Sequence, residues 1–535
     1  MRNEPFVTGA PIDVSPISVR VAARPRLGWQ ALVMAGSVGV ILFFSFYNLA
    51  SFPLTWFDEG SHLHVPKAVI RLGAYADYSS DGFRYFGPTI GVGPTVLLPV
   101  AAAFRAFGIG LLQARLVMVL YLLAAIVAFY RLARVLGGRR LAWVATALFV
   151  TSRGVSLFEY GRQVLGEVPG FFFLAAGLAL WLATWEKSSW RRLALVGLLL
   201  GLSVVTKNQY LLVIAPAIGL AWLANLLYYR LAPQRVFVVP GLMAVGAYGL
   251  WQLFTLVYLG PANALTNLAL FRDATAGAAL VFSPDLVRLS LQDLLSFKVY
   301  LGLLFAVLVY GLSRVLPRER DAQRWGLLFI MIVVNLLWYI VASISWERYA
   351  FPALALSALF VARLFSDVTG GLHLDLAALR GSFQRNDALL PDRALRATIL
   401  ASLLGIIAVP LIQTGSQIIS PPFNAPAAMA AYLTRNVPAS AVVETWEPEM
   451  GFLTDLNFHY PPSGLLNKAV AYIWLNGAPV AQFYDFEQPA APDYVLMGTF
   501  GRWVAAYPLP KLEQDYHLVA SIGEYDLYRR DASAK

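Results

Sequence analysis

Residues 114–158 read ARLVMVLYLLAAIVAFYRLARVLGGRRLAWVATALFVTSRGVSLF. Two apolar runs, 114–132 and 141–158, lie on either side of a short basic segment that ends in Arg139 and Arg140. A helix rises about 1.5 Å per residue, so each run is close to the length needed to cross roughly 30 Å of hydrocarbon. The stretch therefore predicts two membrane-spanning helices joined by a tight loop on one aqueous face.

The composition of the whole chain agrees with this reading. Its 535 residues are 58% hydrophobic and 13% charged, and soluble domains carry nearly twice that charged fraction. A single soluble core is therefore excluded, and a bundle of helices is expected because lipid leaves no other partner for backbone N–H and C=O groups. The alternation typical of an outer-membrane barrel is absent. The chain has no cysteine, which excludes disulfides, thiolate catalysis and cysteine-ligated metals.

Similar apolar runs recur along most of the chain, and they predict an all-α polytopic bundle of about eleven transmembrane helices. The expected spans are 29–50, 114–132, 141–158, 168–185, 192–206, 210–229, 236–258, 295–313, 325–343, 350–365 and 397–417. Residues 1–28 form a polar N-terminal segment. We expect the first span to be a retained helix, because no small-residue cleavage site follows it.

The loops also predict the orientation. The arginine-rich connections follow the even-numbered spans, as Arg131, Arg134, Arg139 and Arg140 do after the second. Since basic loops stay in the cytoplasm, the N-terminus is expected there and the C-terminus on the opposite side. A bacterial plasma (inner) membrane suits this pattern, and an endoplasmic-reticulum membrane is the alternative. The basic excess lies in short loops, so the net charge of +10 does not indicate a nucleic-acid partner.

Three longer segments are expected on the outer side. Residues 51–113 have a helical pattern broken by a Gly/Pro stretch, and 259–294 contain short amphipathic pieces that suit a membrane surface. Residues 419–535 are expected to form a small soluble α/β domain that follows a transmembrane domain over 29–418. In it a helix is predicted at 427–435 and strands at 441–445, 494–497, 518–522 and 525–528.

Charged residues gather at the outer ends of the spans, where charge next to hydrocarbon marks function by default. They come from four separate loops: Asp58 and Glu59, Arg162 and Glu167, Lys207, and Glu347 and Arg348. If the bundle brings these ends together, a carboxylate could take a proton from a hydroxyl, and the cations could hold a phosphate leaving group. No nucleotide-binding motif is visible, so a membrane-borne donor, a polyprenyl-phosphate sugar, would fit.

The same segments carry a resemblance. The pieces are TWFDEGSHLHVPKAVIRLGAY with RYFG at 84–87, YGRQVLGEVPGFFF, GLSVVTKNQYLLVIAP and ERYAFPALAL, followed by YLTRNVPASAVVETWEPE, PDYVLMG and GEYDLYRR in the C-terminal part. In this order, over most of the chain, they resemble the GT-C fold glycosyltransferases, and more narrowly the protein O-mannosyltransferase superfamily with its aminoarabinose transferase branch. The resemblance implies an inverting transfer, outside the membrane, from a polyprenyl-phosphate sugar to a hydroxyl acceptor.

The resemblance also implies roles for residues. Asp58 would be the general base and Glu59 its catalytic or supporting partner, with further support expected from Glu167 and Tyr349. Three cations would contact the donor phosphate: Arg162, Lys207 and Arg348. The aminoarabinose branch has a lysine soon after its RYF element, where this chain reads Gly87-Pro88-Thr89. Arg84 is the candidate replacement, although arginine and lysine bind phosphate differently. The departure weakens the case for that branch's sugar and its lipid A acceptor.

Simpler interpretations compete for the same residues. Asp58 and Glu59 could cap a helix, the three cations could be interfacial anchors, and Glu347 could pair locally. His62 and His64 are weak candidates for a metal site, because their spacing points them to different helix faces and zinc needs three or four ligands. We therefore expect no cofactor and no catalytic metal.

Two other functions compete with the transferase. A transporter or lipid flippase would bind near the bilayer midplane, where these spans hold few polar residues. A glycan ligase or polymerase would share the phosphate-binding arginines but not the acid pair after the first span. The acceptor class stays open at this point, between protein, lipid and polysaccharide.

Overall fold

The structure is a computed structural model that describes residues 29–84, 91–186, 189–372, 391–488 and 490–531. Residues 44–535 form one compact unit, and the chain up to Phe43 forms a separate one. The apolar helices are α1 (Trp29–Phe46), α4 (Leu111–Thr151), α6 (Glu167–Ala183), α7 (Trp190–Thr206), α8 (Leu211–Ala224), α9 (Arg235–Ala278), α11 (Leu304–Val315), α12 (Arg320–Ala342), α13 (Phe351–Val368) and α15 (Pro391–Ile419).

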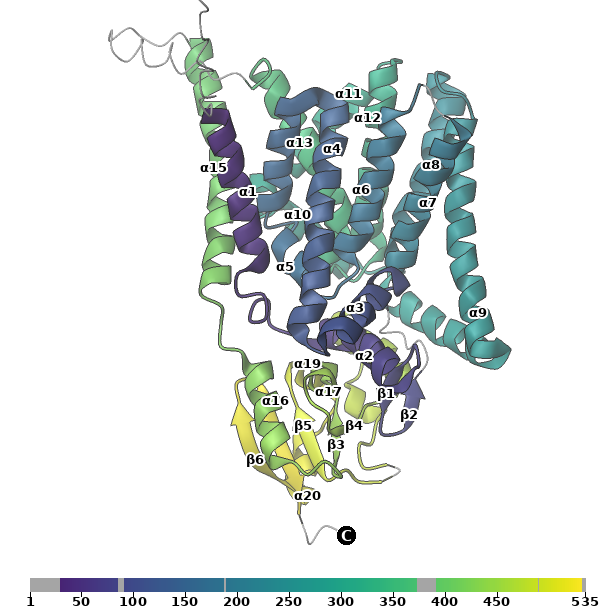
Figure 1. The fold of residues 1–535 in the computed structure, drawn as a ribbon, viewed down its shortest axis with the longest axis vertical. Helices are drawn as coiled ribbons and strands as arrows, with labels where there is room; N and C mark the ends of the chain where they lie inside the picture. Colours follow the sequence, from purple (N-terminus) through teal and green to yellow (C-terminus); the bar gives the residue numbers. More distant parts are fainter. Residues whose placement is uncertain (1–28, 85–90, 187–188, 373–390, 489, 532–535) are drawn as a thin grey trace, which may run out of the picture. The chain divides into compact units, whose positions relative to one another are not determined.

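These helices confirm the predicted helical membrane fold. Within the described ranges, six helices are long and apolar enough to cross a membrane, and four apolar helices of 10–17 residues accompany them. Most predicted spans overlap a helix, with two departures: span 295–313 begins in the segment 296–303, which is not α-helical, and span 141–158 runs past the end of α4 at Thr151. Residues 114–132 and 141–151 lie in the two halves of α4, which break at Gly137 and Gly138, where Gly138 has a φ of 74°. α4 packs on α6, and α7 packs on α6 and α9 (Figure 1).

The segment after α1 is more ordered than a broken helix. It contains α2 (Phe57–Leu72), the antiparallel hairpin β1 (Asp77–Ser79) and β2 (Gly82–Arg84), and α3 (Pro94–Phe107). Short helices complete the bundle unit: α5 (Leu157–Arg162), η1 (Asn208–Tyr210), the π-turn η2 (Asn225–Tyr229), α10 (Pro284–Leu295), η3 (Tyr300–Gly302) and η4 (Glu347–Ala350). α9 bends at Gly260, whose φ of 75° suits glycine, and runs into the second predicted outer segment.

The C-terminal part is the predicted α/β unit. Its helices are α16 (Ala425–Asn436), α17 (Pro448–Leu453), η5 (Ser463–Leu465), α18 (Leu466–Trp474), η6 (Val480–Gln482), α19 (Thr499–Trp503) and α20 (Leu509–Asp515). Its sheet has the order β4-β3-β5-β7-β6, from β3 (Val442–Thr445), β4 (Asn457–His459), β5 (Tyr494–Met497), β6 (Tyr516–Ile522) and β7 (Tyr525–Arg530). β3 is parallel to β4 and β5, and β7 is antiparallel to β5 and β6.

The sheet unit docks on α2 through α17, as the foot of the bundle in Figure 1 shows. The two backbones approach closely, because a Cβ atom on Gly60 would lie 2.3 Å from the backbone nitrogen of Glu449. Lys67 also donates hydrogen bonds to the carbonyl oxygens of Gly451 (2.8 Å), Phe452 (3.2 Å) and Thr454 (2.6 Å) at the end of α17. α2 is therefore held by the bundle on one side and by the C-terminal unit on the other.

Candidate active site

A cavity of about 270 Å³ lies where α2, the bundle and the C-terminal unit meet. Its walls are mostly apolar and aromatic, which is typical of sites that enclose an organic ligand. The polar side chains on it are few: Asp58, His62, Lys207, Asn208, Gln209 and Arg348. The opposite wall comes from the C-terminal unit, as Leu466, Ala469, Val470, Ile473 and Trp474 of α18 and Phe500 and Trp503 of α19.

Asp58 faces this cavity from the first turn of α2. The residue before the helix, Trp56, is extended, and an acid in the first turn is stabilised by the positive end of the helix dipole. The Asp58 carboxylate forms an ion pair with Arg348 and remains 17% exposed. It is therefore accessible from the cavity while a cation holds its charge.

Lys207 is positioned by backbone contacts around a break in the bundle. It follows the last residue of α7 with extended φ and ψ of −147° and 112°, and it forms an isolated bridge with Val92. A Cβ atom on Gly166 would lie 2.7 Å from the Lys207 side chain, so that position needs glycine. The ammonium nitrogen lies 2.9 Å from Oε1 of Glu167. The bridge to Val92 and the close contact with Gly166 thus hold the backbone of Lys207, and its side chain lines the cavity.

Arg348 carries the second positive charge of the cavity. Its guanidinium lies 3.9 Å from the Trp346 ring centroid and 5.6 Å from that of Trp56, and its Nε lies 3.9 Å from Oε1 of Glu167. Nη1 of Arg348 makes the ion pair with Asp58, whereas Nε has no hydrogen-bond partner among the described residues. Buried donors without partners are costly, so this guanidinium can receive an anion such as a phosphate.

Tyr349 also lines the cavity, next to Arg348. Its ring stacks on Trp338 with 5.5 Å between the centroids. The amide of Asn335 holds the local backbone, since it donates to the Tyr349 carbonyl (3.0 Å) and accepts from the amide of Ala353 (2.9 Å). The structure thus brings together five of the residues that the sequence singled out: Asp58, Lys207, Arg348, Glu167 and Tyr349.

Glu59 points away from this group. It forms a bidentate ion pair with Arg115, with distances of 2.9 and 2.5 Å, and neither side chain is exposed. It also accepts a hydrogen bond from the amide of Val164 (3.2 Å). Glu59 therefore occupies a structural position beside the cavity. Arg115 escaped the sequence analysis, although a lone arginine at the start of the apolar run 114–132 was a signal for such a buried partner.

Arg162 and Arg84 are not among the residues that line the cavity. The Arg162 guanidinium donates to the carbonyl oxygens of Phe44 (2.9 Å) and Tyr47 (2.7 Å). The Arg84 guanidinium lies 2.5 Å from Asp77 and 4.8 Å from the centre of the Tyr460 ring. Both cations are occupied by other parts of the chain. The nearby Gly87-Pro88-Thr89 element lies outside the described residues.

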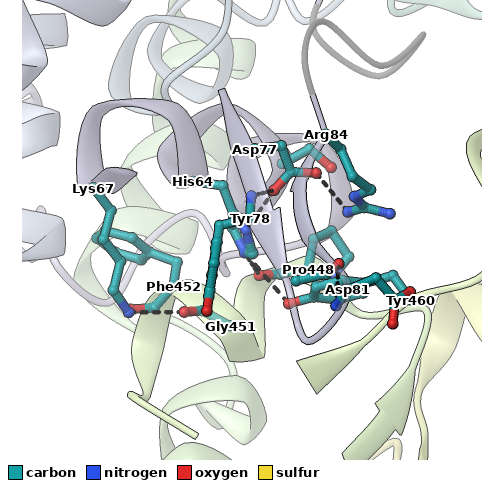
Figure 2. A network of polar contacts seen from close by, with 12 residues as sticks. His64, Lys67, Asp77, Tyr78, Asp81, Arg84, Pro448, Gly451, Phe452 and Tyr460 are labelled. Carbon is teal, nitrogen blue, oxygen red and sulfur yellow. Dashed lines mark hydrogen bonds and ion pairs between the residues drawn. The ribbon is translucent and has the colours of Figure 1, made fainter. Parts of the chain in front are cut away.

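The two histidines of α2 face different partners, as their spacing predicts. Nδ1 of His64 lies 2.8 Å from Asp77, and its Nε2 lies 2.7 Å from the Pro448 carbonyl oxygen, so His64 joins the β1–β2 hairpin to the C-terminal unit (Figure 2). His62 lines the cavity instead. In the described part of the chain, no group of three or more His, Asp or Glu side chains is placed to hold a metal ion.

Comparisons with known proteins place this geometry in context. Residues 92–244 match the model of a family described as dolichyl-phosphate-mannose-protein mannosyltransferase. No curated protein matches the sequence. Among solved structures, the chain is similar to ArnT from Cupriavidus metallidurans bound to undecaprenyl phosphate, with 15% identity, a TM-score of 0.61, and coverage of 95% of this chain and 99% of that one. It is also similar to the oligosaccharyltransferase AglB from Archaeoglobus fulgidus in complex with an inhibitory peptide and a dolichol-phosphate, with 14% identity, a TM-score of 0.60, and coverage of 94% and 74%.

Proposed function

Because the chain is a multi-pass membrane protein with the fold of the GT-C glycosyltransferases, we propose that it moves a sugar from a polyprenyl phosphate to a hydroxyl acceptor. The observation that carries the proposal is the shared cavity, in which Asp58 lies beside Lys207 and Arg348 within apolar walls. One carboxylate beside two cations is the set of charges that this transfer needs.

In the proposed reaction, Asp58 accepts the proton of the acceptor hydroxyl as general base. The acceptor oxygen attacks the anomeric carbon on the face opposite the phosphate, and the bond between that carbon and the phosphate oxygen breaks. A single displacement of this kind inverts the anomeric centre. Lys207 and Arg348 hold the negative charge that grows on the departing polyprenyl phosphate, and the buried Nε of Arg348 has no hydrogen-bond partner among the described residues.

Glu167 and the apolar wall of the cavity would complete the binding site for the donor. Glu167 lies 2.9 Å from Lys207 and 3.9 Å from Arg348, so it would orient both of them, and together with Asp58 it balances their two positive charges. The apolar wall would accept the first isoprene units of the donor. Undecaprenyl phosphate in the ArnT structure and dolichol-phosphate in the AglB structure support a donor of this class.

We also propose that the site faces the extracytoplasmic side of a plasma (inner) membrane. The cavity opens at the end of the bundle that carries the C-terminal unit, and the arginine-rich loop at Arg139 and Arg140 lies at the far end of the helices that enclose it. Basic loops remain in the cytoplasm.

The test of this function is the Asp58→Asn variant, purified and supplied with polyprenyl-phosphate sugars and hydroxyl acceptors. The isosteric amide removes the base, and a general base contributes about 10²–10⁴-fold to the rate, so we expect a loss of at least a hundredfold in kcat from a protein that still folds and inserts. Asp455→Asn is the matched control, because Asp455 is exposed and pairs with Lys67 and Arg71 outside the cavity. Full turnover by Asp58→Asn would remove Asp58 from the role of base.

A second measurement tests the donor class directly. Lipid that co-purifies with the protein is identified by mass spectrometry, and we expect a polyprenyl phosphate or its glycoside. Lys207→Ala should lose this lipid, because a phosphate contact at a buried cation is a strong, charge-assisted interaction. Equal retention of a polyprenyl phosphate by Lys207→Ala would contradict the assignment of that cation.

A further inference from the structure

The proposed reaction assigns no task to three polar side chains that line the cavity, His62, Asn208 and Gln209, and His62 is the one among them whose ring offers a hydrogen-bond acceptor fixed by a contact to the backbone. His62 lies on α2 one helical turn after Asp58, is 3% exposed and lines the same cavity. Its Nδ1 lies 2.7 Å from the carbonyl oxygen of Val164. That residue belongs to the segment between α5 and α6, and its amide bonds Glu59. Glu59 thus holds the Val164 peptide through its amide, and the carbonyl oxygen of Val164 holds the imidazole of His62.

The contact with Val164 determines which ring nitrogen carries hydrogen. A carbonyl oxygen only accepts hydrogen bonds, so Nδ1 of His62 must be the protonated nitrogen. In the neutral ring, Nε2 is then a hydrogen-bond acceptor. No partner of Nε2 occurs in the part of the chain that the structure describes. The cavity therefore contains a neutral hydrogen-bond acceptor, Nε2 of His62, in addition to the carboxylate of Asp58 and the cations Lys207 and Arg348.

The surroundings keep this ring neutral. Burial is the largest cause that lowers the pKa of His62, to about 4, and the positive charge of Lys207 lowers it further. Asp58, the Val164 carbonyl and Glu167 raise the pKa, but they do not offset the burial. At neutral pH the imidazole thus carries no charge and cannot compete with Lys207 and Arg348 for an anion.

We propose that Nε2 of His62 accepts a hydrogen bond from a hydroxyl group on the sugar of the lipid-linked donor, and that His62 thereby recognises the transferred sugar. The inference rests on the proposed function. A buried acceptor needs a donor, and neither a phosphate diester nor an isoprenoid chain has one. The attacking hydroxyl gives its single proton to Asp58. The hydroxyls of the transferred ring, which would lie between Asp58 and the phosphate at Lys207, are the donors that the substrate brings to this part of the cavity.

If His62 binds the sugar, the affinity for the sugar-loaded lipid and the affinity for the bare lipid phosphate should depend on different residues. Recognition by Lys207 and Arg348 depends on the phosphate alone, whereas recognition by His62 depends on the sugar. A site built to bond a substrate hydroxyl rejects an analogue that lacks it, because the buried acceptor is then left unpaired. A donor whose sugar lacks the relevant hydroxyl should therefore bind no better than the bare lipid phosphate.

The experiment compares the binding of undecaprenyl phosphate with that of a panel of undecaprenyl-phosphate hexoses and pentoses to the full chain in nanodiscs. His62→Asn keeps an N–H group at the position of Nδ1 and removes the acceptor from the cavity. We expect wild type to bind at least one sugar-loaded lipid more tightly than the bare one, and His62→Asn to lose about tenfold for that lipid. Its affinity for undecaprenyl phosphate should stay within twofold. His62→Gln, which returns an acceptor oxygen near the position of Nε2, should recover part of the loss.

His517→Gln is the matched control, because His517 is 54% exposed and pairs with Asp531. It should change neither affinity. The inference is overturned if wild type prefers no sugar-loaded lipid, or if His62→Asn weakens the bare and the loaded lipid equally. Nitrogen-15 spectra of labelled histidine in the wild-type chain give a readout that needs no variant: a protonated Nε2 at pH 7 would also overturn it. Failure of wild type to bind undecaprenyl phosphate at all would instead refute the proposed function.

Discussion

Asp58 and Glu59 are neighbours with separate tasks, because successive residues of a helix point about 100° apart. Asp58 faces the cavity and Arg348, whereas Glu59 faces the interior and Arg115. The first acid keeps access to solvent and to a substrate, and the second has none. A pair of adjacent acids therefore provides one group that faces the cavity and one that is buried in the protein interior.

This separation predicts opposite phenotypes for the two amide variants. Glu59→Gln leaves the charge of Arg115 buried without its counter-ion, so the free energy of unfolding should fall by about 3–5 kcal/mol. Thermal unfolding in detergent, followed by tryptophan fluorescence, measures the loss. Glu347→Gln is the control, because Glu347 pairs with Lys298 in a partly exposed position and should cost less than about 1 kcal/mol. A stable Glu59→Gln protein would contradict this account of the pair.

Arg162 and Lys207 give a second contrast at this scale. Since Arg162 binds the carbonyl oxygens of Phe44 and Tyr47, Arg162→Gln should leave the affinity for undecaprenyl phosphate unchanged and lower the melting temperature by several degrees. Lys207→Gln should weaken the binding of undecaprenyl phosphate, and it should also lower the melting temperature because Glu167 loses its nearest buried partner. A lipid-binding titration and a melting curve on the same samples check both. A tenfold loss of lipid affinity in Arg162→Gln would restore this residue to the phosphate site.

The sequence could identify which residues carry charge near the membrane, but only packing decides which of them meet. Lys207 and Arg348 are 141 residues apart in number and contact the same Glu167, which no local pattern predicts. The lone pair of His62 depends on a single carbonyl oxygen in another segment. Two tryptophans of the cavity wall, Trp474 and Trp503, come from a unit whose pattern indicates only a soluble domain.

At the scale of elements, α17 joins the C-terminal sheet to α2 and holds an unusual pair of acids. The carboxylate of Glu447 accepts from the amide of Gly501 (2.8 Å), and that of Glu449 accepts from the hydroxyl of Tyr525 (2.8 Å). Both side chains are buried. Burial raises the pKa of Glu447 to about 7, and burial together with the charge of Glu447 raises the pKa of Glu449 well above its usual value.

These shifts predict how stability depends on pH. An unfolded glutamate loses its proton near pH 4.5, whereas the folded pair retains protons to about pH 7, so the pair costs stability as the pH rises through this window. Glu449→Gln keeps the contact with Tyr525 and removes one charge. The variant should unfold at a higher temperature than wild type at pH 8, by roughly 1–3 kcal/mol in free energy, and at nearly the same temperature at pH 4.5. A lower midpoint at pH 8 would contradict the prediction.

Elements differ in how far they could be predicted. The helices of the bundle follow from long apolar runs, and four strands of the C-terminal sheet follow from alternation. β4, with three residues before Pro461 and Pro462, is too short to show a period. The β1–β2 hairpin was missed for the same reason. α4 appeared as two spans because Gly137 and Gly138 interrupt its pattern, and the chain does leave helical geometry there.

At the scale of the whole molecule, the bundle and the C-terminal unit form the cavity together. The orientation of the chain in the membrane can be measured with single cysteines, because the native chain has none. Glu524 and Arg139 are both exposed, the first between β6 and β7 and the second in the basic loop of α4. A membrane-impermeant maleimide added to intact cells should label Glu524→Cys and not Arg139→Cys, because basic loops are retained in the cytoplasm.

Permeabilised cells provide the control for that experiment, since both variants should then react. Labelling of Arg139→Cys in intact cells, with Glu524→Cys protected, would invert the proposed topology. The result is independent of the chemistry, and it decides which compartment must supply the acceptor.

The wall contributed by α18 and α19 also affects when activity can begin during biosynthesis. Asp58 and its helix are synthesised long before Trp474 and Trp503. In a nascent chain, the wall of the cavity opposite Asp58 is therefore still missing. The enclosure around Asp58 and the cations closes only after nearly the last strand-forming segments have been made and folded onto α2. We therefore expect chains that end before α18 to lack the proposed activity, because one wall of their cavity is missing.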